Sequence, residues 1–173
     1  MKIIGIGDIH GHDTWKRIVN DNPDADKFVF AGDYVDSYSV PHETQINNLL
    51  DILQFKKDNP DKVVLLIGNH DFQYTQYALG IYERYTGFNE LAAGMLAAIF
   101  KLEKDLFQAA YLHDNILFTH AGVTSTWIKS TVLLMEEDHF DLGEVPVDEY
   151  INQVYKASPY FFTLPDGGDP YGN

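Results

Sequence analysis

The sequence predicts an α/β fold built on a parallel sheet. Its first 71 residues alternate between short β-branched runs and amphipathic segments in the order β-α-β-α-β. The clearest strand is the run from Val63 to Ile67, which is apolar without alternation and is therefore expected to be buried on both faces. Strands joined through helical crossovers of this length are typical of parallel sheets.

Each element of this first half has a local signal. Residues 1–7 form a β-rich run, and Asp13 is a suitable N-cap for the helix that follows it. Residues 27–31 predict the second strand. From Glu43 onward, apolar residues recur at the helical spacing i, i+3, i+4 and i+7, until the turn-forming residues 58–61. These apolar positions are Ile46, Leu49, Leu50 and Leu53.

The second half is less regular. An alanine- and leucine-rich stretch predicts a helix over residues 90–106. Residues 107–112 and 116–119 are expected to pair as a hairpin. Turn formers fill residues 166–173, which predicts a frayed tail. No repeat or linker divides the chain, so one domain is expected over residues 1–173.

The composition excludes several classes of protein. The chain has 173 residues, 45% of them hydrophobic, and a formal charge of −14. That charge repels nucleic acid, and the absence of cysteine excludes disulfides and thiolate metal sites. The apolar run at Met1–Ile6 is too short for a signal peptide, and no run has membrane-spanning length. A soluble cytoplasmic protein that binds neither membrane nor nucleic acid is therefore expected.

Polar side chains directly follow each of the predicted strands. Because the carboxyl ends of parallel strands present such groups at one edge of a sheet, they are expected to converge. Oxygen and imidazole ligands without sulfur suit divalent ions such as Mn²⁺, Fe²⁺, Zn²⁺ or Mg²⁺, and two ions about 3.5–4 Å apart can clamp a phosphoryl group. Such ions also reverse the local field that would otherwise repel a phosphate. The residues are Asp8, His10, Asp33, Asp36, Asn69, His70 and His120.

These residues form four motifs: D-I-H-G (8–11), G-D-Y-V-D (32–36), G-N-H-D (68–71) and H-A-G (120–122). Together they resemble the metallophosphoesterase superfamily, and within it the calcineurin-like branch that contains the serine/threonine phosphoprotein phosphatases. The resemblance covers residues 1 to about 122. It implies an αββα sandwich, in which two mixed β-sheets are flanked by helices around a dinuclear metal centre, with the second sheet incomplete in this chain.

The resemblance also implies a role for each residue. Asp8, His10 and Asp33 would hold the first metal ion. Asp33 would bridge to the second ion, with Asn69 and His120 as further ligands. His70 would be the proton donor, charged and held by Asp36, and a water or hydroxide bridging the ions would attack phosphorus. A pair of Mn²⁺ ions is expected, with Fe, Zn or Mg as alternatives.

The chain departs from the family pattern at two places. Ser37 stands where the phosphatase branch carries a phosphate-binding arginine; Arg17 and Arg84 could replace it but are expected at the surface. The family's last metal-binding histidine, in a G-H-x motif, has no counterpart, because His139 has acidic neighbours and is expected at the surface. Truncation, a second metal with fewer protein ligands, or an outside ligand would each explain this gap. The second ion is therefore expected to bind more weakly.

Three functions remain open from the sequence. The leading one is hydrolysis of a phosphate monoester, in a phosphoprotein or a small molecule. The second is hydrolysis of a dinucleoside polyphosphate or a phosphodiester, because the aromatic segment 72–88 could bind a flat group, although its tyrosines are also expected as packing residues. The third is a weakly active or inactive interaction module, since one metal ligand is missing. The natural substrate and the oligomeric state stay open.

Overall fold

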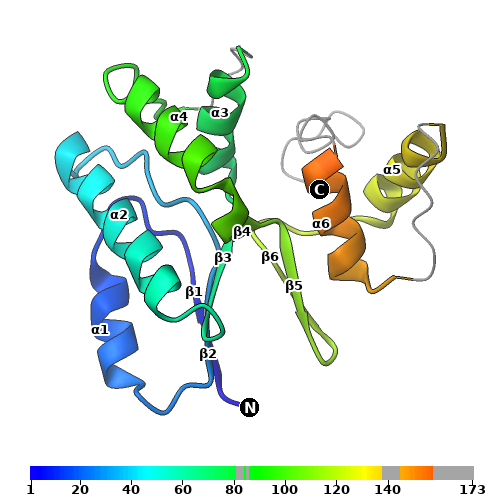
Figure 1. The fold of residues 1–173 in the computed structure, drawn as a ribbon, viewed down its shortest axis with the longest axis horizontal. Coiled ribbons are helices and arrows are strands. Elements are labelled where there is room, and N and C mark those ends of the chain that lie inside the picture. The colour runs from blue at the N-terminus through cyan, green and yellow to red at the C-terminus, as the bar shows by residue number, and fades with distance from the viewer. Residues whose placement is uncertain (81–83, 85, 138–144, 158–173) are drawn as a thin grey trace. The chain divides into compact units, whose positions relative to one another are not determined.

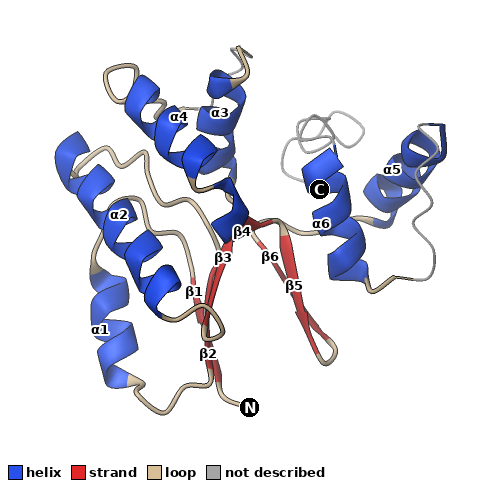
Figure 2. Ribbon diagram, in the orientation of Figure 1, coloured by secondary structure: helices blue, strands red, loops and turns tan. Residues whose placement is uncertain are grey.

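The computed structural model describes residues 1–80, 84, 86–137 and 145–157. The chain divides into two compact units, Met1–Gln108 and Ala109–Asn173. Figure 1 traces the elements of both units by residue number, and Figure 2 marks the helices and strands.

The first unit is built on a parallel sheet of four strands. They are β1 (Ile3–Ile6), β2 (Lys27–Phe30), β3 (Val63–Leu66) and β4 (Phe107–Gln108), and they lie in the order β1-β2-β3-β4. Every neighbouring pair is parallel, so the loops that follow β1, β2 and β3 all leave the same edge. This edge carries the first three sequence motifs.

Helices connect these strands. They are α1 (Thr14–Asp21), α2 (His42–Asp58), α3 (Asn69–Ala78) and α4 (Ala93–Leu102), followed by the 3₁₀ turn Lys104–Leu106. α1 and α2 lie side by side, and the Trp15 indole N–H donates to Asn48 across them at 2.9 Å. α3 and α4 also pack together.

The core of the first unit is aliphatic and aromatic. All four residues of β3 are buried, as the unbroken apolar run predicts. The Trp15 ring lies 5.7 Å from the ring of Phe30 and 5.5 Å from that of Phe55, which anchors α1 to the sheet and to α2. Burying residues of this size contributes about 1.5–3 kcal/mol each. The core therefore fixes the strands whose ends carry the motifs.

The second unit contains an antiparallel pair, β5 (Ala110–His113) and β6 (Ile116–Thr119), and the helices α5 (Ser125–Glu137) and α6 (Val147–Ala157). α6 packs on β5. The Asn152 side chain accepts from the backbone N–H groups of Ala109 and Ala110 at 2.8 and 3.0 Å, and donates to the Ala110 carbonyl at 2.8 Å. These bonds occupy backbone groups that a strand edge would otherwise leave unpaired.

The predicted α/β architecture with two sheets is confirmed, with two corrections. Each sheet is of one kind and not mixed: the first is parallel and the second antiparallel. The run 107–112 is not one strand. Phe107 and Gln108 pair with β3, whereas the hairpin begins at Ala110, because Asn152 binds the backbone at the junction. The helices α3 and α5 were not predicted.

The expectation of one domain over residues 1–173 stays a prediction, and residues 166–173 lie outside the described part of the chain. Within the described residues, no helix combines the length and the apolar character needed to cross a membrane.

Candidate active site

The loops after β1 and β2 contain a cluster of unusual backbone conformations. His10, Asp33 and Asp36 all have positive φ, at 42°, 52° and 68°. Non-glycine residues in this region are uncommon and cost free energy unless their surroundings hold them. Here the His10 and Gly11 N–H groups donate to the carbonyls of Asp33 and Tyr34 at 2.7 and 2.9 Å. The two loops are therefore locked together, which places Asp33 and His10 side by side.

Two glycines allow the loops after β2 and β3 to touch. A Cβ atom at Gly68 would lie 2.2 Å from Asp33 Oδ1 and 2.4 Å from the Asp33 backbone nitrogen. Gly32 has φ +109°, and a Cβ there would lie 2.5 Å from the Gly68 nitrogen. Only glycine permits this approach. The glycines of the G-D and G-N-H-D motifs therefore bring the Asp33 and His70 loops into contact.

The buried side chain of Asp71 connects the same two loops through hydrogen bonds. Its side chain is fully buried and accepts backbone N–H groups from Asp33, Tyr34 and Gly68 at 2.7, 2.8 and 2.9 Å. The bond from Gly68 also caps the first turn of α3. Burial and the negative charge of Asp33 raise the pKa of Asp71 to about 8, against the opposing effect of the three N–H donors. Asp71 is thus a structural centre that the sequence did not reveal.

Asp8 and Asp33 form a pair of carboxylates that could hold a cation, and the His10 ring lies near Asp33. Asp8 and Asp33 each offer a carboxylate oxygen, and these atoms lie within 4.8 Å of one another. His10 Nδ1 lies 2.7 Å from the Val35 carbonyl, to which only a protonated Nδ1 can donate. In the neutral imidazole, Nε2 is then the nitrogen with the lone pair, and it lies 3.8 Å from Asp33 Oδ2. Two carboxylates and an oriented imidazole suit a divalent ion.

A histidine–carboxylate dyad borders this cluster. His70 Nδ1 lies 3.1 Å from Asp36 Oδ2, and the Asp36 side chain is completely buried. This hydrogen bond raises the pKa of His70, outweighing the opposing effect of partial burial. The His70 backbone N–H donates to Asp33 Oδ1 at 2.9 Å, and the rings of His70 and His10 lie 5.2 Å apart, edge to face. The dyad and the candidate metal ligands therefore share one site.

The comparison with known families agrees with this geometry. The family model described as "Calcineurin-like phosphoesterase" matches residues 1–168. The chain belongs to the calcineurin-like phosphoesterase family. This membership confirms the family resemblance of the four sequence motifs.

Among curated proteins, the chain is similar to a symmetrical bis(5'-nucleosyl)-tetraphosphatase from Haemophilus ducreyi. The two are 26% identical over 165 residues, which cover 89% of this chain and 57% of the relative. The chain thus spans little more than half the length of this relative.

The two other predicted metal ligands of this calcineurin-like phosphoesterase follow strands as expected. Asn69 is the first residue of α3, directly after β3 and Gly68, and is exposed. His120 follows β6 in the second unit and is half-buried. Their roles as ligands stay predictions.

The positions that depart from the family pattern have local structural roles. Ser37 Oγ accepts backbone N–H groups from Ser39 and Val40, both at 3.2 Å, and so shapes the turn before α2. Arg17 is exposed on α1. Arg84 is also exposed, pairs with Glu90 and lies 4.8 Å from the Phe88 ring centroid. His139 lies outside the described residues.

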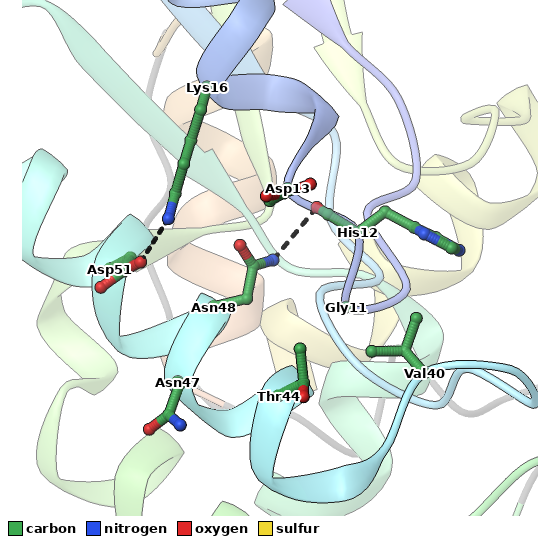
Figure 3. Close-up of a pocket in the computed structure, with 9 residues that line it drawn as sticks. All are labelled: Gly11, His12, Asp13, Lys16, Val40, Thr44, Asn47, Asn48 and Asp51. Carbon is green, nitrogen blue, oxygen red and sulfur yellow. Dashed lines mark hydrogen bonds and ion pairs between the residues drawn. The ribbon is translucent and has the colours of Figure 1, made fainter.

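A polar pocket of about 300 Å³ begins beside the first motif, at Gly11 and His12, and extends between α1 and α2 (Figure 3). Its polar groups largely bind one another. Lys16 pairs with Asp51 at 2.5 Å, and Asn48 donates to the His12 carbonyl at 3.2 Å. The pocket is therefore not assigned to the active site.

Sequence reasoning missed two further contacts of the dyad. Gln73 and Tyr74 are both fully buried, and both donate hydrogen bonds to Asp36. The signal was available: they stand three and four residues after His70, a spacing that brings side chains to one face of a helix. Tyr74 is also the best packed of the described tyrosines in segment 72–88, whereas Tyr82 and Tyr85 lie outside the described residues.

Proposed function

We propose that this chain is a metal-dependent phosphoesterase that hydrolyses a phosphate monoester. The supporting observation is the contact between two groups of residues at one edge of the parallel sheet. Asp8, His10 and Asp33 offer oxygen and imidazole donors to a cation, while His70 and Asp36 form a proton-donating dyad beside them. The His70 backbone N–H binds Asp33, which couples the two groups.

In the proposed enzyme, Asp8, His10 and Asp33 would hold the first divalent ion, and Asp33 would also be a ligand of a second. Asn69 and His120 are the further ligands proposed from the family resemblance. When bound, such ions polarise the phosphoryl oxygens and lower the pKa of water. Mn²⁺ is the proposed ion, and Fe²⁺, Zn²⁺ and Mg²⁺ are alternatives that the same oxygen and imidazole donors suit. The cations also offset the −14 charge that would repel an anionic substrate.

His70 supplies the proton that the leaving oxygen needs. Its Nδ1–H donates to Asp36, so Nε2–H is the proton left for transfer. The hydrogen bond to Asp36 raises the pKa of His70, which favours the protonated imidazolium that a general acid needs. When the P–O bond breaks, the bonding pair stays on the leaving oxygen, which takes the Nε2 proton and departs as a neutral alcohol or phenol.

A second substrate class is favoured by two observations. The relative from Haemophilus ducreyi is named as a dinucleoside tetraphosphatase. Ser37 also stands where a phosphatase-type arginine would bind the phosphate, and it serves a backbone turn instead. Hydrolysis of a phosphoanhydride in a dinucleoside polyphosphate is therefore the alternative. Rates with p-nitrophenyl phosphate, its bis ester and a dinucleoside tetraphosphate, all with Mn²⁺, separate the two classes.

The test of the proposed function is His70→Asn, with His113→Asn as the matched control. His113 pairs with Asp114 at 3.4 Å in the second unit and has no proposed part in the chemistry. General acid catalysis contributes about 10²–10⁴-fold, so His70→Asn should lose most of the activity, whereas the control retains it. The enzyme hypothesis fails if the unmodified chain hydrolyses no phosphoester or phosphoanhydride with Mn²⁺, Fe²⁺, Zn²⁺ or Mg²⁺. That result would favour the interaction module instead.

A further inference from the structure

The Asp36 carboxylate has more hydrogen-bond donors than a dyad with His70 requires. Oδ2 accepts from His70 Nδ1 and from Gln73 Nε2, and Oδ1 accepts from the Tyr74 hydroxyl. The Asp36 side chain is fully buried, so each donor replaces a water molecule that the carboxylate cannot reach. Two of these donors crowd one oxygen, while Tyr74 is the donor found on the other.

The Tyr74 hydroxyl is held in a fixed position. Its ring stacks on Phe88 at 5.0 Å and 17°, and on Phe100 at 6.3 Å and 8°. Its oxygen accepts the Asn89 backbone N–H at 2.9 Å, so the hydroxyl hydrogen is left to donate to Asp36. The stacked rings and the hydrogen bond from Asn89 therefore restrict the direction in which the Tyr74 hydroxyl can donate.

The surroundings extend this restraint to neighbouring elements. Asn89 Oδ1 accepts the backbone N–H groups of Leu91 and Ala92 at 3.1 and 3.2 Å, and its Nδ2 lies 2.5 Å from His42 Nδ1. Asn89 therefore connects the start of α2 with the approach to α4. The hydroxyl that meets Asp36 is thus anchored to three helices of the first unit.

We propose that Tyr74 is a positioning residue that sets the rotation of the Asp36 carboxylate and so aims the imidazole of His70 at the leaving oxygen. Rotation of a carboxylate about its Cβ–Cγ bond has broad energy wells, so hydrogen bonds decide its orientation. With Oδ1 held by Tyr74, Oδ2 faces His70. Without that bond the carboxylate can turn toward Gln73, and His70 loses its alignment. The inference rests on the proposed function, because the orientation of the His70 imidazole affects the rate only if His70 donates a proton.

The test compares leaving groups in Tyr74→Phe, which removes the hydroxyl and keeps the stacked ring. Phenyl phosphate releases a phenolate about as basic as a tyrosine side chain (pKa about 10), so it needs the proton. p-Nitrophenyl phosphate releases a much weaker base and needs it less. We expect kcat to fall about 10-fold or more for phenyl phosphate and about 2-fold or less for p-nitrophenyl phosphate, with KM unchanged for both.

Tyr150→Phe is the control for loss of a buried tyrosine hydroxyl, because Tyr150 bonds Thr131 at 2.6 Å in the second unit. It should leave the ratio of the two rates unchanged. An equal loss on both substrates in Tyr74→Phe, with the melting temperature lowered, would show a merely structural hydroxyl and overturn the inference. Gln73→Met tests the same carboxylate from its other oxygen if Tyr74→Phe does not fold.

A second readout does not depend on activity. In the metal-free protein, the His70 Nδ1 proton bonded to Asp36 should give a downfield NMR signal, assigned by its loss in His70→Asn. This signal should shift or broaden in Tyr74→Phe and persist in Tyr150→Phe. An unchanged signal overturns the inference, even if the unmodified chain hydrolyses no ester and the proposed function itself has failed.

Discussion

Replacing Gly68 by alanine should damage both the fold and the metal site. Its φ of −99° is open to any residue, so backbone strain plays no part. The obstacle is Asp33, whose backbone nitrogen would lie 2.4 Å from the new methyl group and whose Oδ1 would lie 2.2 Å away. Backbone cannot swing aside as a flexible side chain can, so the two loops must separate.

The size of the effect follows from the contacts that separation breaks. Overpacking alone costs about 1–3 kcal/mol. The N–H groups of Asp33 and Gly68 both donate to the buried Asp71 side chain, at 2.7 and 2.9 Å, and leaving buried polar groups without partners adds about 1–3 kcal/mol. The two contributions add to a total loss of about 2–6 kcal/mol. For a chain of this length, each kcal/mol lowers the melting temperature by about 2–4 °C.

Gly94→Ala is the matched control, because a Cβ at Gly94 meets nothing within 4 Å and the residue lies inside α4. There the same substitution should stabilise the protein by about 0.5–1 kcal/mol. Urea unfolding of the metal-free proteins measures both changes, and calorimetric titration with Mn²⁺ measures the site. Gly68→Ala with unaltered stability and unaltered metal affinity would refute the close contact between the two loops.

Further predictions concern the carboxylate and histidine groups. Asp71→Asn should destabilise the protein by about 1.5–3 kcal/mol in urea unfolding, because an amide NH₂ would face the N–H donors that the carboxylate accepts; equal stability would mean that these bonds contribute little. His10→Ala should weaken Mn²⁺ binding by 10-fold or more in a calorimetric titration, whereas alanine at the exposed His12 should not, and equal effects would remove His10 from the ligand set. The same titration on the unmodified chain should resolve a tight and a weak site; two equally tight sites would contradict a second ion with fewer ligands.

The sequence predicted the sheet because its strands have local signals. The run Val63–Ile67 is apolar throughout and is followed at once by glycine, so the strand and the turn could both be placed, although the helix that begins at Asn69 was not predicted. The hairpin boundary could not be placed in this way. Phe107 to Leu112 has no internal break, and the division at Ala109 depends on Asn152, more than forty residues later in the chain.

The motif positions were also predictable, whereas their supports were not. D-x-H and G-N-H-D place donors after strands, a relation between neighbours in sequence. Asp71 looked like one more polar residue, because its partners Asp33 and Tyr34 come from another loop. Tyr74 was expected to be a packing residue, and its ring does stack on Phe88. Its hydroxyl also donates a hydrogen bond to Asp36, which the sequence did not indicate. Contacts between residues of different loops leave no pattern in the sequence, so they become visible only in the three-dimensional structure.

The acidic residues at this edge fall into two kinds, and the distinction decides which can serve a cation. Asp36 and Asp71 are buried side chains whose oxygens already accept fixed O–H and N–H donors of the protein. Asp8 and Asp33 each offer an oxygen within 4.8 Å of the other. Asp8 is open to solvent, whereas Asp33 is buried and its Oδ1 also accepts the His70 backbone N–H. Two like charges at this separation repel, and a divalent ion between them relieves that cost. Because an ion that binds only the folded chain stabilises it by mass action, Mn²⁺ should raise the melting temperature through Asp8 and Asp33, and asparagine at Asp8 should abolish that rise.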